Sequence, residues 1–171
     1  MRAHKGIRPQ DIIVLLKLVD AKDKRQVVLA KALHMSQAEI SDSLNRSVAS
    51  GLIAQNKKQV FKSNLMEFLQ FGIKYTFPAI PGRRQRGLAT GHSAIPLKNE
   101  IKADIDYVWP YYKGDILGES IEPLHKNQHL AAMDDPVLYE KLALIDAIRL
   151  RNPRETELAV KYLKERMEYE R

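Results

Sequence analysis

Two short helical patterns separated by only three residues constrain the fold of this chain more than any other feature. Residues 26–33, QVVLAKAL, carry apolar side chains at helical spacing, and a second amphipathic segment follows after HMS. SQAE, residues 36–39, has the Ser-x-x-Glu spacing of a capping box, which predicts that the second helix starts at Ser36. Gly51 predicts its end, because glycine readily adopts the left-handed conformation that terminates helices.

The spacing of these two helices is typical of a helix-turn-helix. Ala30 provides the small residue that the motif needs where its helices approach each other. His34 occupies the turn position that is often glycine, and histidine can adopt the left-handed conformation required there. Four apolar residues are expected to hold the pair together: Leu29, Leu33, Ile40 and Leu44.

The second helix has a polar outer face. If Ile40, Leu44 and Val48 point inward, polar side chains project outward from the turns that enter a major groove in this motif. Amide, hydroxyl and guanidinium groups are the usual readers of base edges. We therefore expect four residues to contact bases, Gln37, Ser41, Asn45 and Arg46, and Ser36 to contact the DNA backbone. The alternative is an ordinary solvated helix face.

Other elements surround this pair. Pro9 predicts the start of a helix over 9–21, and NLMEFLQFGI predicts another over 64–73. Between them, LIAQNKKQVFKS has two apolar segments around a polar tip, which predicts a hairpin that turns at Asn56. The expected fold is mainly α with a small β-hairpin.

The stretch VVLAKALHMSQAEISDSLNRSVASGLI resembles the winged helix-turn-helix domain of MarR-type bacterial regulators, and the likeness covers roughly residues 8–65. This resemblance implies that Lys57 and Lys58 lie at the tip of a wing, near phosphates or the minor groove. It favours a DNA-binding domain over residues 1–73. The VWP, GESIEPL and DPVLYEKLALIDAIR segments of the remaining chain are similar to a group of little-studied MarR-like bacterial proteins.

Residues 74–124 change character. Their prolines and glycines exclude a long helix, and their apolar residues favour an ordered, extended arm packed on the body over a flexible linker. YVWPYYKGDILGESIEPL suggests one short hairpin within the arm. PGRRQRG collects Arg83, Arg84 and Arg86 in a loop that suits a minor groove or a phosphate track, or else is simply solvated.

Residues 125–171 form the expected C-terminal helical region, with helices over 136–150 and 153–168. Asp135-Pro136 and Asn152-Pro153 have the cap and first-turn proline of helix starts. The apolar stripes of these helices need cover. They are expected either to form a dimer or partner surface or to pack on the winged domain within one chain.

Charge and composition narrow the function. The net charge is +7, and residues 1–65 hold 12 lysines and arginines against 5 acidic residues, whereas residues 103–171 hold 10 against 14. This asymmetry fits contact of the N-terminal part with a polyanion. The chain has no cysteine, which excludes disulfides and thiolate chemistry, and it has neither an apolar run of membrane-spanning length nor a secretory leader pattern. A cytoplasmic protein is expected.

Signals for catalysis or metal binding are weak. His125 and His129 have helical metal-ligand spacing, but no HExxH glutamate accompanies them. GHS, residues 91–93, lacks the flanks of a nucleophile elbow, and no phosphate-binding glycine loop occurs. We expect no enzyme activity, metal or cofactor.

These observations favour a sequence-specific regulator of transcription, a repressor or autoregulator, that binds double-stranded DNA as a homodimer. A lone helix reads few base pairs, so paired half-sites about 10 base pairs apart, or a multiple of that, are expected. The alternative is an antitoxin-like or adaptor module that binds protein through a winged-helix scaffold. Its helix 36–50 would show apolar residues outward.

Overall fold

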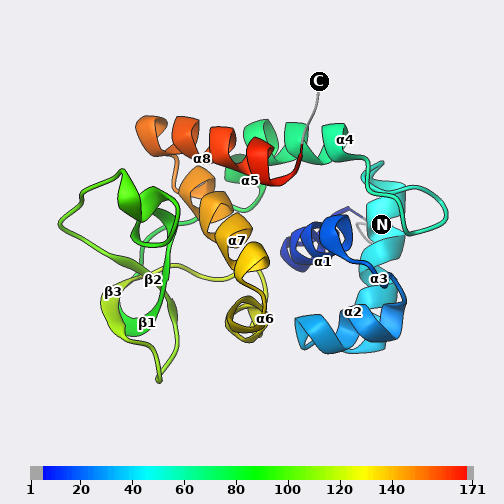
Figure 1. The fold of residues 1–171 in the computed structure, drawn as a ribbon, viewed down its shortest axis with the longest axis horizontal. Helices are drawn as coiled ribbons and strands as arrows, with labels where there is room; N and C mark the ends of the chain where they lie inside the picture. The colour runs from blue at the N-terminus through cyan, green and yellow to red at the C-terminus, as the bar shows by residue number, and fades with distance from the viewer. Residues whose placement is uncertain (1–5, 169–171) are drawn as a thin grey trace, which may run out of the picture.

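The computed structural model describes residues 6–168 and has a helical body with a small β-sheet at one end (Figure 1). Helices α1 (Pro9–Asp20), α2 (Gln26–Leu33) and α3 (Gln37–Ala49) lie together at the other end, and α7 (Pro136–Arg149) runs between the two parts. The expectation of a mainly helical chain is confirmed. Within residues 6–168, no helix combines the length and apolarity needed to cross a bilayer.

Local sequence sets the ends of α2 and α3. His34 ends α2 with a φ of 54°, the left-handed conformation expected at the turn. Both hydrogen bonds of the capping box form at α3: the Glu39 N–H donates to Ser36 Oγ at 3.1 Å, and the Ser36 N–H donates to Glu39 Oε2 at 2.7 Å. Gly51 has a φ of 73° just beyond the helix. The predicted bounds of both helices are confirmed to within one residue.

Residues 52–61 reverse direction around Asn56, whose Oδ1 accepts the N–H groups of Lys58 and Gln59 at 2.9 and 3.2 Å. The turn at Asn56 is therefore confirmed. The two sides meet through one antiparallel bridge, between Ile53 and Val60. The expected hairpin is reduced to this single bridge.

The next helical segment is longer than predicted. It comprises α4 (Lys62–Glu67), a π-helical turn (Phe68–Gly72) and α5 (Ile73–Thr76), whereas the sequence predicted a helix over 64–73. The π turn shifts the helical register by one residue, and the segment ends before Pro78, which cannot continue a helix.

The sheet consists of β1 (Arg84–Thr90), β2 (Tyr107–Pro110) and β3 (Ile116–Ser120), which close into a small barrel. β1 pairs antiparallel with both other strands, through Gly87–Pro110 and Gly87–Ile116 among other pairs. β2 and β3 consequently run parallel and meet at Tyr107–Glu119. The prediction of a hairpin within 107–124 is wrong, because each strand is bonded to β1 and an antiparallel pair could not satisfy both ladders.

The arm is ordered and packed on the body, as predicted. Between its strands lie two 3-10 turns: Gly91–Ser93 is buried throughout, and Leu97–Asn99 buries Leu97. The buried Asp146 of α7 holds the arm: its Oδ2 accepts Thr90 Oγ1–H and Trp109 Nε1–H, each at 2.6 Å. Arg149 pairs with Asp146 Oδ1 at 2.7 Å and donates Nε–H to the Phe77 carbonyl at 2.8 Å.

The C-terminal helices pack within the chain. They are α6 (Gln128–Asp134), which the sequence did not predict, followed by α7 and by α8 (Pro153–Arg166). Every residue from 141 to 149 is buried. Asp135 and Lys141 pair with Lys17 and Asp20 of α1 at 2.6 and 2.5 Å. One hydrophobic cluster joins α1–α3 to α7 and α8, so the inner faces of the C-terminal helices are covered without a second chain.

Candidate nucleic-acid interface

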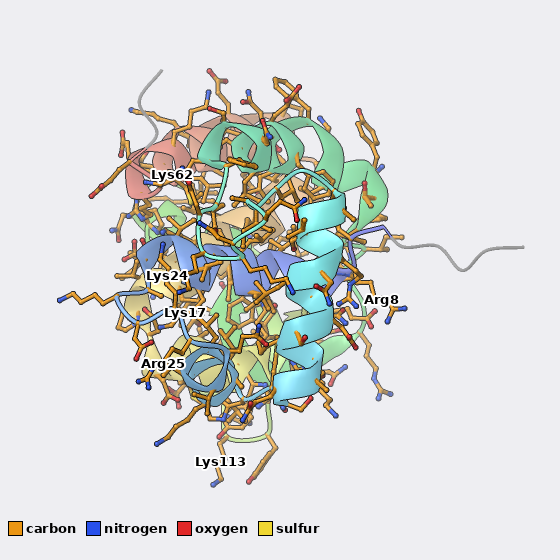
Figure 2. The ribbon with its side chains drawn as sticks, turned by 90° about the vertical axis from the view of Figure 1, so that its right-hand side faces the viewer. Arg8, Lys17, Lys24, Arg25, Lys62 and Lys113 are labelled. Carbon is orange, nitrogen blue, oxygen red and sulfur yellow. The ribbon has the colours of Figure 1, made fainter. Side chains whose placement is uncertain are left out.

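α3 lies along the edge of the molecule farthest from the sheet (Figure 1), and Figure 2 views it face on. Its inner face packs through Ile40 and Leu44, as predicted, and also through two buried serines, Ser43 and Ser47. Small serine side chains let α3 approach the body closely. The outer face remains open to solvent along the length of the helix.

Three of the predicted base-contacting residues share this outer face. Gln37, Ser41 and Asn45 are spaced by four residues and therefore lie one above another. Gln37 and Asn45 are exposed and Ser41 is half-buried, and their side chains make no hydrogen bond with the described part of the chain. Exposed Ala38, Ala49 and Asp42 lie beside them, so the face combines free amides with two small side chains and one carboxylate.

Arg46 has a different role from the one predicted. Its Nε–H and Nη2–H groups donate to the two oxygens of the Asp11 carboxylate at 2.8 and 2.7 Å. The side chain of Arg46 is 14% exposed and that of Asp11 is fully buried. The expectation that the Arg46 side chain projects freely outward is therefore wrong, because its guanidinium neutralises a buried acid on α1.

The N-terminal end of α3 is held by residues that precede and form α6. His34 Nε2 lies 2.9 Å from Asp134 Oδ2, and the Asn127 side-chain amide donates to the His34 carbonyl at 2.7 Å. His125 Nδ1 accepts the Asn127 N–H, so its Nε2 carries the proton that faces Glu39 Oε1 at 3.2 Å. We call these three contacts the α6 clasp.

The α6 clasp and the capping box both include a hydrogen bond to the Glu39 carboxylate. The Ser36 N–H, followed by the His125 ring, holds the pKa of Glu39 below its usual range, so that this carboxylate stays ionised. Ser36, the predicted backbone contact, is exposed at the first turn. Its Oγ accepts the Glu39 N–H, which leaves its own hydroxyl proton free for an external acceptor.

Cations flank α3 on both sides (Figure 2). Arg8 lies on one side, and Lys24 and Lys62 lie on the other, where an open groove of about 590 Å³ includes Val19, Gln59 and both lysines in its lining. Lys24 Nζ donates to the Lys58 carbonyl at 2.9 Å, but none of these three side chains pairs with an acid in residues 6–168.

Of the cations near α3, the sequence predicted Lys57 and Lys58 as DNA contacts but missed Arg8, Lys24 and Lys62. Lys58 is exposed and Lys57 is half-buried, with a φ of 58° at the turn. Their positions in the sequence could have identified these three cations, because each lies at or just before the start of a helix: α1, α2 and α4.

Not every cation near α3 is free. Lys17 pairs with Asp135 at 2.6 Å, and Arg25 pairs with Asp23 at 2.6 Å. The Arg25 side chain lowers the pKa of Asp23 to about 2, so this aspartate stays ionised and offsets the arginine. The positive charge beside α3 therefore comes from Arg8, Lys24 and Lys62, which pair with no acid in residues 6–168.

The arginines of the arm do not join this surface. Arg84 and Arg86 belong to β1, and Arg83 precedes it; β1 lies at the opposite end of the molecule from α3, with α7 between them (Figure 1). Arg86 also donates to the Gly114 carbonyl at 3.3 Å. The sequence placed these three residues in a loop, but Arg84 and Arg86 lie in a strand, and their contact with a DNA backbone stays a prediction separate from the surface of α3.

Groups that could suggest catalysis or metal binding have structural partners. His92 of GHS is buried between Glu155 Oε1 at 3.0 Å and the Ile105 carbonyl at 2.7 Å. His125 belongs to the α6 clasp, and His129 packs on Tyr111 with 4.9 Å between ring centroids. Across the described residues, no three His, Cys, Asp or Glu side chains are grouped as a metal site requires.

Neither models of protein families, nor curated proteins, nor solved structures gave a match to this chain.

Proposed function

We propose that this protein is a sequence-specific double-stranded DNA-binding regulator of transcription that inserts α3 into the major groove. The observation that carries the proposal is the outer face of α3, where free Gln37 and Asn45 amides lie beside small Ala38 and Ala49 and between cations that pair with no acid in residues 6–168. Exposed Asp42 on this face is an acid, so we do not assign it to a phosphate. A protein-docking helix would instead be expected to show large apolar side chains on that face.

The dimensions and chemistry support this geometry. A major groove about 12 Å wide admits one α-helix, and Gln or Asn can pair with adenine through two hydrogen bonds. Phosphate strands border the groove on both sides. Arg8 on one side of α3 and Lys24 with Lys62 on the other are suited to those two strands.

The winged helix-turn-helix identity and the MarR-like kinship are part of the proposal. They rest on the α2–turn–α3 spacing, the left-handed His34 and the reversal at Asn56 that carries Lys57 and Lys58. With a single bridge, this wing is short, so we assign it to phosphate contact.

We propose that two copies bind adjacent half-sites, because one α3 reads too few base pairs for a regulator. The inner faces of α7 and α8 are covered within the chain, so the pairing would use another surface or the DNA itself. Sedimentation of the protein with and without its preferred DNA measures the stoichiometry. One copy per selected site would overturn this part.

The deciding experiment is selection of genomic fragments, including the region upstream of the gene itself, by purified protein at physiological salt. We expect one preferred sequence. Asn45→Ala should cost about 1–3 kcal/mol on that sequence and relax the preference at one base pair. Asn99→Ala is the matched control, because Asn99 is an exposed asparagine outside α3. Recovery of no preferred sequence would contradict the proposal and favour the protein-binding adaptor.

A further inference from the structure

A second group of exposed cations lies on the β-sheet, at the opposite end of the molecule from α3 (Figure 1). Arg84 and Arg86 are two residues apart on β1, so their side chains lie on the same face of the strand. Arg83 precedes β1, and Tyr112 and Lys113 belong to the loop between β2 and β3. The Lys113 side chain points away from the body (Figure 2). We call these five exposed residues the sheet patch.

The loop between β2 and β3 is held against β1 by a close backbone contact. A Cβ atom at Gly114 would lie 2.1 Å from the Gly87 carbonyl oxygen, so only glycine fits there. The Tyr111 N–H donates to the Arg86 carbonyl at 3.0 Å, and Arg86 Nη1 donates to the Gly114 carbonyl at 3.3 Å. The loop is therefore fixed beside the arginines of β1.

Tyr112 offers an aromatic ring that the body supports but does not cover. The residue is 78% exposed. Its ring meets the Tyr111 ring edge-on with 5.4 Å between centroids, and Tyr111 in turn packs on His129 of α6 at 4.9 Å. The Lys113 ammonium lies 5.4 Å from the Tyr112 centroid. The Tyr112 ring is therefore available to stack on a planar group of a ligand, beside a positive charge.

The cations of the sheet patch pair with no acid in residues 6–168. The neighbouring acids are Glu119, which lies across from Arg84 in the ladder, and exposed Asp115, which follows the loop. The ladder partner of Arg86 is instead Leu117, an apolar residue that is 50% exposed. Positive charge and apolar surface are thus both open to solvent, which suits an anionic chain that also carries planar rings.

Single-stranded nucleic acid has both of these features. Its phosphates complement lysine and arginine side chains, and its unstacked bases stack on exposed aromatic rings. A duplex keeps its bases stacked on one another, so it could contact the cations but could not use the face of Tyr112. An acidic protein would likewise satisfy only the cations.

We propose that the sheet patch binds single-stranded nucleic acid, with a base stacked on Tyr112 and phosphates at Arg84, Arg86 and Lys113. This site goes beyond the proposed function, which concerns a duplex at α3, and does not depend on it.

Binding is tested by fluorescence anisotropy of dye-labelled oligothymidylate and oligouridylate, each of about 12 nucleotides, titrated with the full chain. Saturable binding is expected, and the tighter oligomer identifies DNA or RNA as the source of the strand. Tyr112→Ala should lower the affinity at least about fivefold, and Tyr112→Phe should recover it, because the phenylalanine ring still stacks. Absence of saturable binding to both oligomers would overturn the site.

Tyr75 of α5 provides a matched control outside the sheet. It is 70% exposed, and the Lys74 ammonium lies 5.2 Å from its ring centroid, as Lys113 lies beside Tyr112. Tyr75→Ala should leave the oligomer affinity unchanged. Lys113→Ala should lower the slope of log affinity against log salt by about 0.7, whereas Lys74→Ala should not. Equal effects of Tyr75→Ala and Tyr112→Ala would overturn the assignment to the sheet patch.

The sheet patch and α3 are distinguished by variants of each. Tyr112→Ala should leave the affinity for the selected duplex unchanged, and Asn45→Ala should leave the affinity for the oligomer unchanged. Oligomer binding that Asn45→Ala weakens and Tyr112→Ala does not would place the single strand on α3 and overturn the proposal. If the protein selects no duplex, the proposed function fails, while the oligomer titrations still decide the sheet patch.

Discussion

At the scale of single residues, the Asp11–Arg46 pair shows how a charge on α3 can stabilise the fold instead of binding an external ligand. Asp11 Oδ2 accepts both the Arg8 N–H that begins α1 and the Arg46 Nε–H, at 2.8 Å each. The pair therefore ties the start of α1 to α3. A buried carboxylate without this partner would be strongly destabilising.

Arg46→Ala should accordingly lower the free energy of unfolding by about 3–5 kcal/mol. The double variant Asp11→Leu/Arg46→Met should recover most of that loss, because neither charge remains buried alone. Urea unfolding followed by circular dichroism measures both. If Arg46→Ala instead unfolded at the wild-type urea concentration and lost only DNA affinity, Arg46 would be a base reader after all.

Asp135 makes the stability of the fold depend on pH in acidic solution. Burial alone would raise its pKa, but the hydrogen bond from Lys17 and the Leu138 N–H outweigh burial, so the net pKa is lowered. A carboxyl with a lowered pKa in the folded state stabilises the fold above its unfolded pKa, near 3.9, and that stability is lost as the pH falls toward the folded value.

Asp135→Asn keeps a helix cap but removes this titration. Its unfolding midpoint in urea should fall less steeply than that of the wild type between about pH 4 and pH 2. Asp115→Asn, an exposed aspartate in the loop before β3, is the control and should follow the wild type. Parallel curves for Asp135→Asn and the wild type would show that the Lys17 contact does not form in solution.

At the scale of elements, removing a cation beside α3 and removing one on β1 should affect the salt dependence of DNA affinity differently. Lys62→Ala should lower the slope of log affinity against log salt by about 1, because one phosphate contact is lost. Arg84→Ala, which removes one charge of the same sign from β1, should leave that slope unchanged. Equal effects of the two variants would mean that the duplex contacts the sheet as well as α3.

Elements whose ends are encoded locally could be predicted from the sequence. Ser36, Asp135 and Asn152 each accept a backbone N–H from the residue three positions on, and α3, α7 and α8 begin directly after them. α6 was missed because it is seven residues long and Asn127 makes no capping hydrogen bond. The parallel pairing of β2 with β3 could not be read from local sequence, since it depends on β1.

The candidate site also has one part that the sequence predicts and another part that depends on residues far apart in the chain. The outward direction of Gln37, Ser41 and Asn45 follows from helical periodicity, which a single sequence contains. The direction of the Arg46 side chain depends on Asp11, 35 residues earlier, and no local sequence pattern identifies that partner. The α6 clasp joins residues still farther apart, such as His34 and Asp134, so only the folded chain brings it together.

At the scale of the whole molecule, α7 connects the sheet to helices α1–α3. Asp146 and Arg149 bind the arm, while Lys141 and the preceding Asp135 bind α1. Residues 12–16 of α1 are all fully buried, which one helix achieves only when it is covered on every side. α2 and α3 cover part of α1, and α7 completes the cover.

A fragment of residues 1–77 should therefore fail to fold cooperatively, although it contains α1–α3 and the helical segment that follows. In the full chain, urea should unfold the helices, measured by circular dichroism, and the arm, measured by Trp109 fluorescence, at the same midpoint, because one core serves both. A fragment with a sharp transition at the wild-type midpoint would show that α1–α3 form an independent domain. Two separate midpoints in the full chain would show that α7 joins two domains that fold independently.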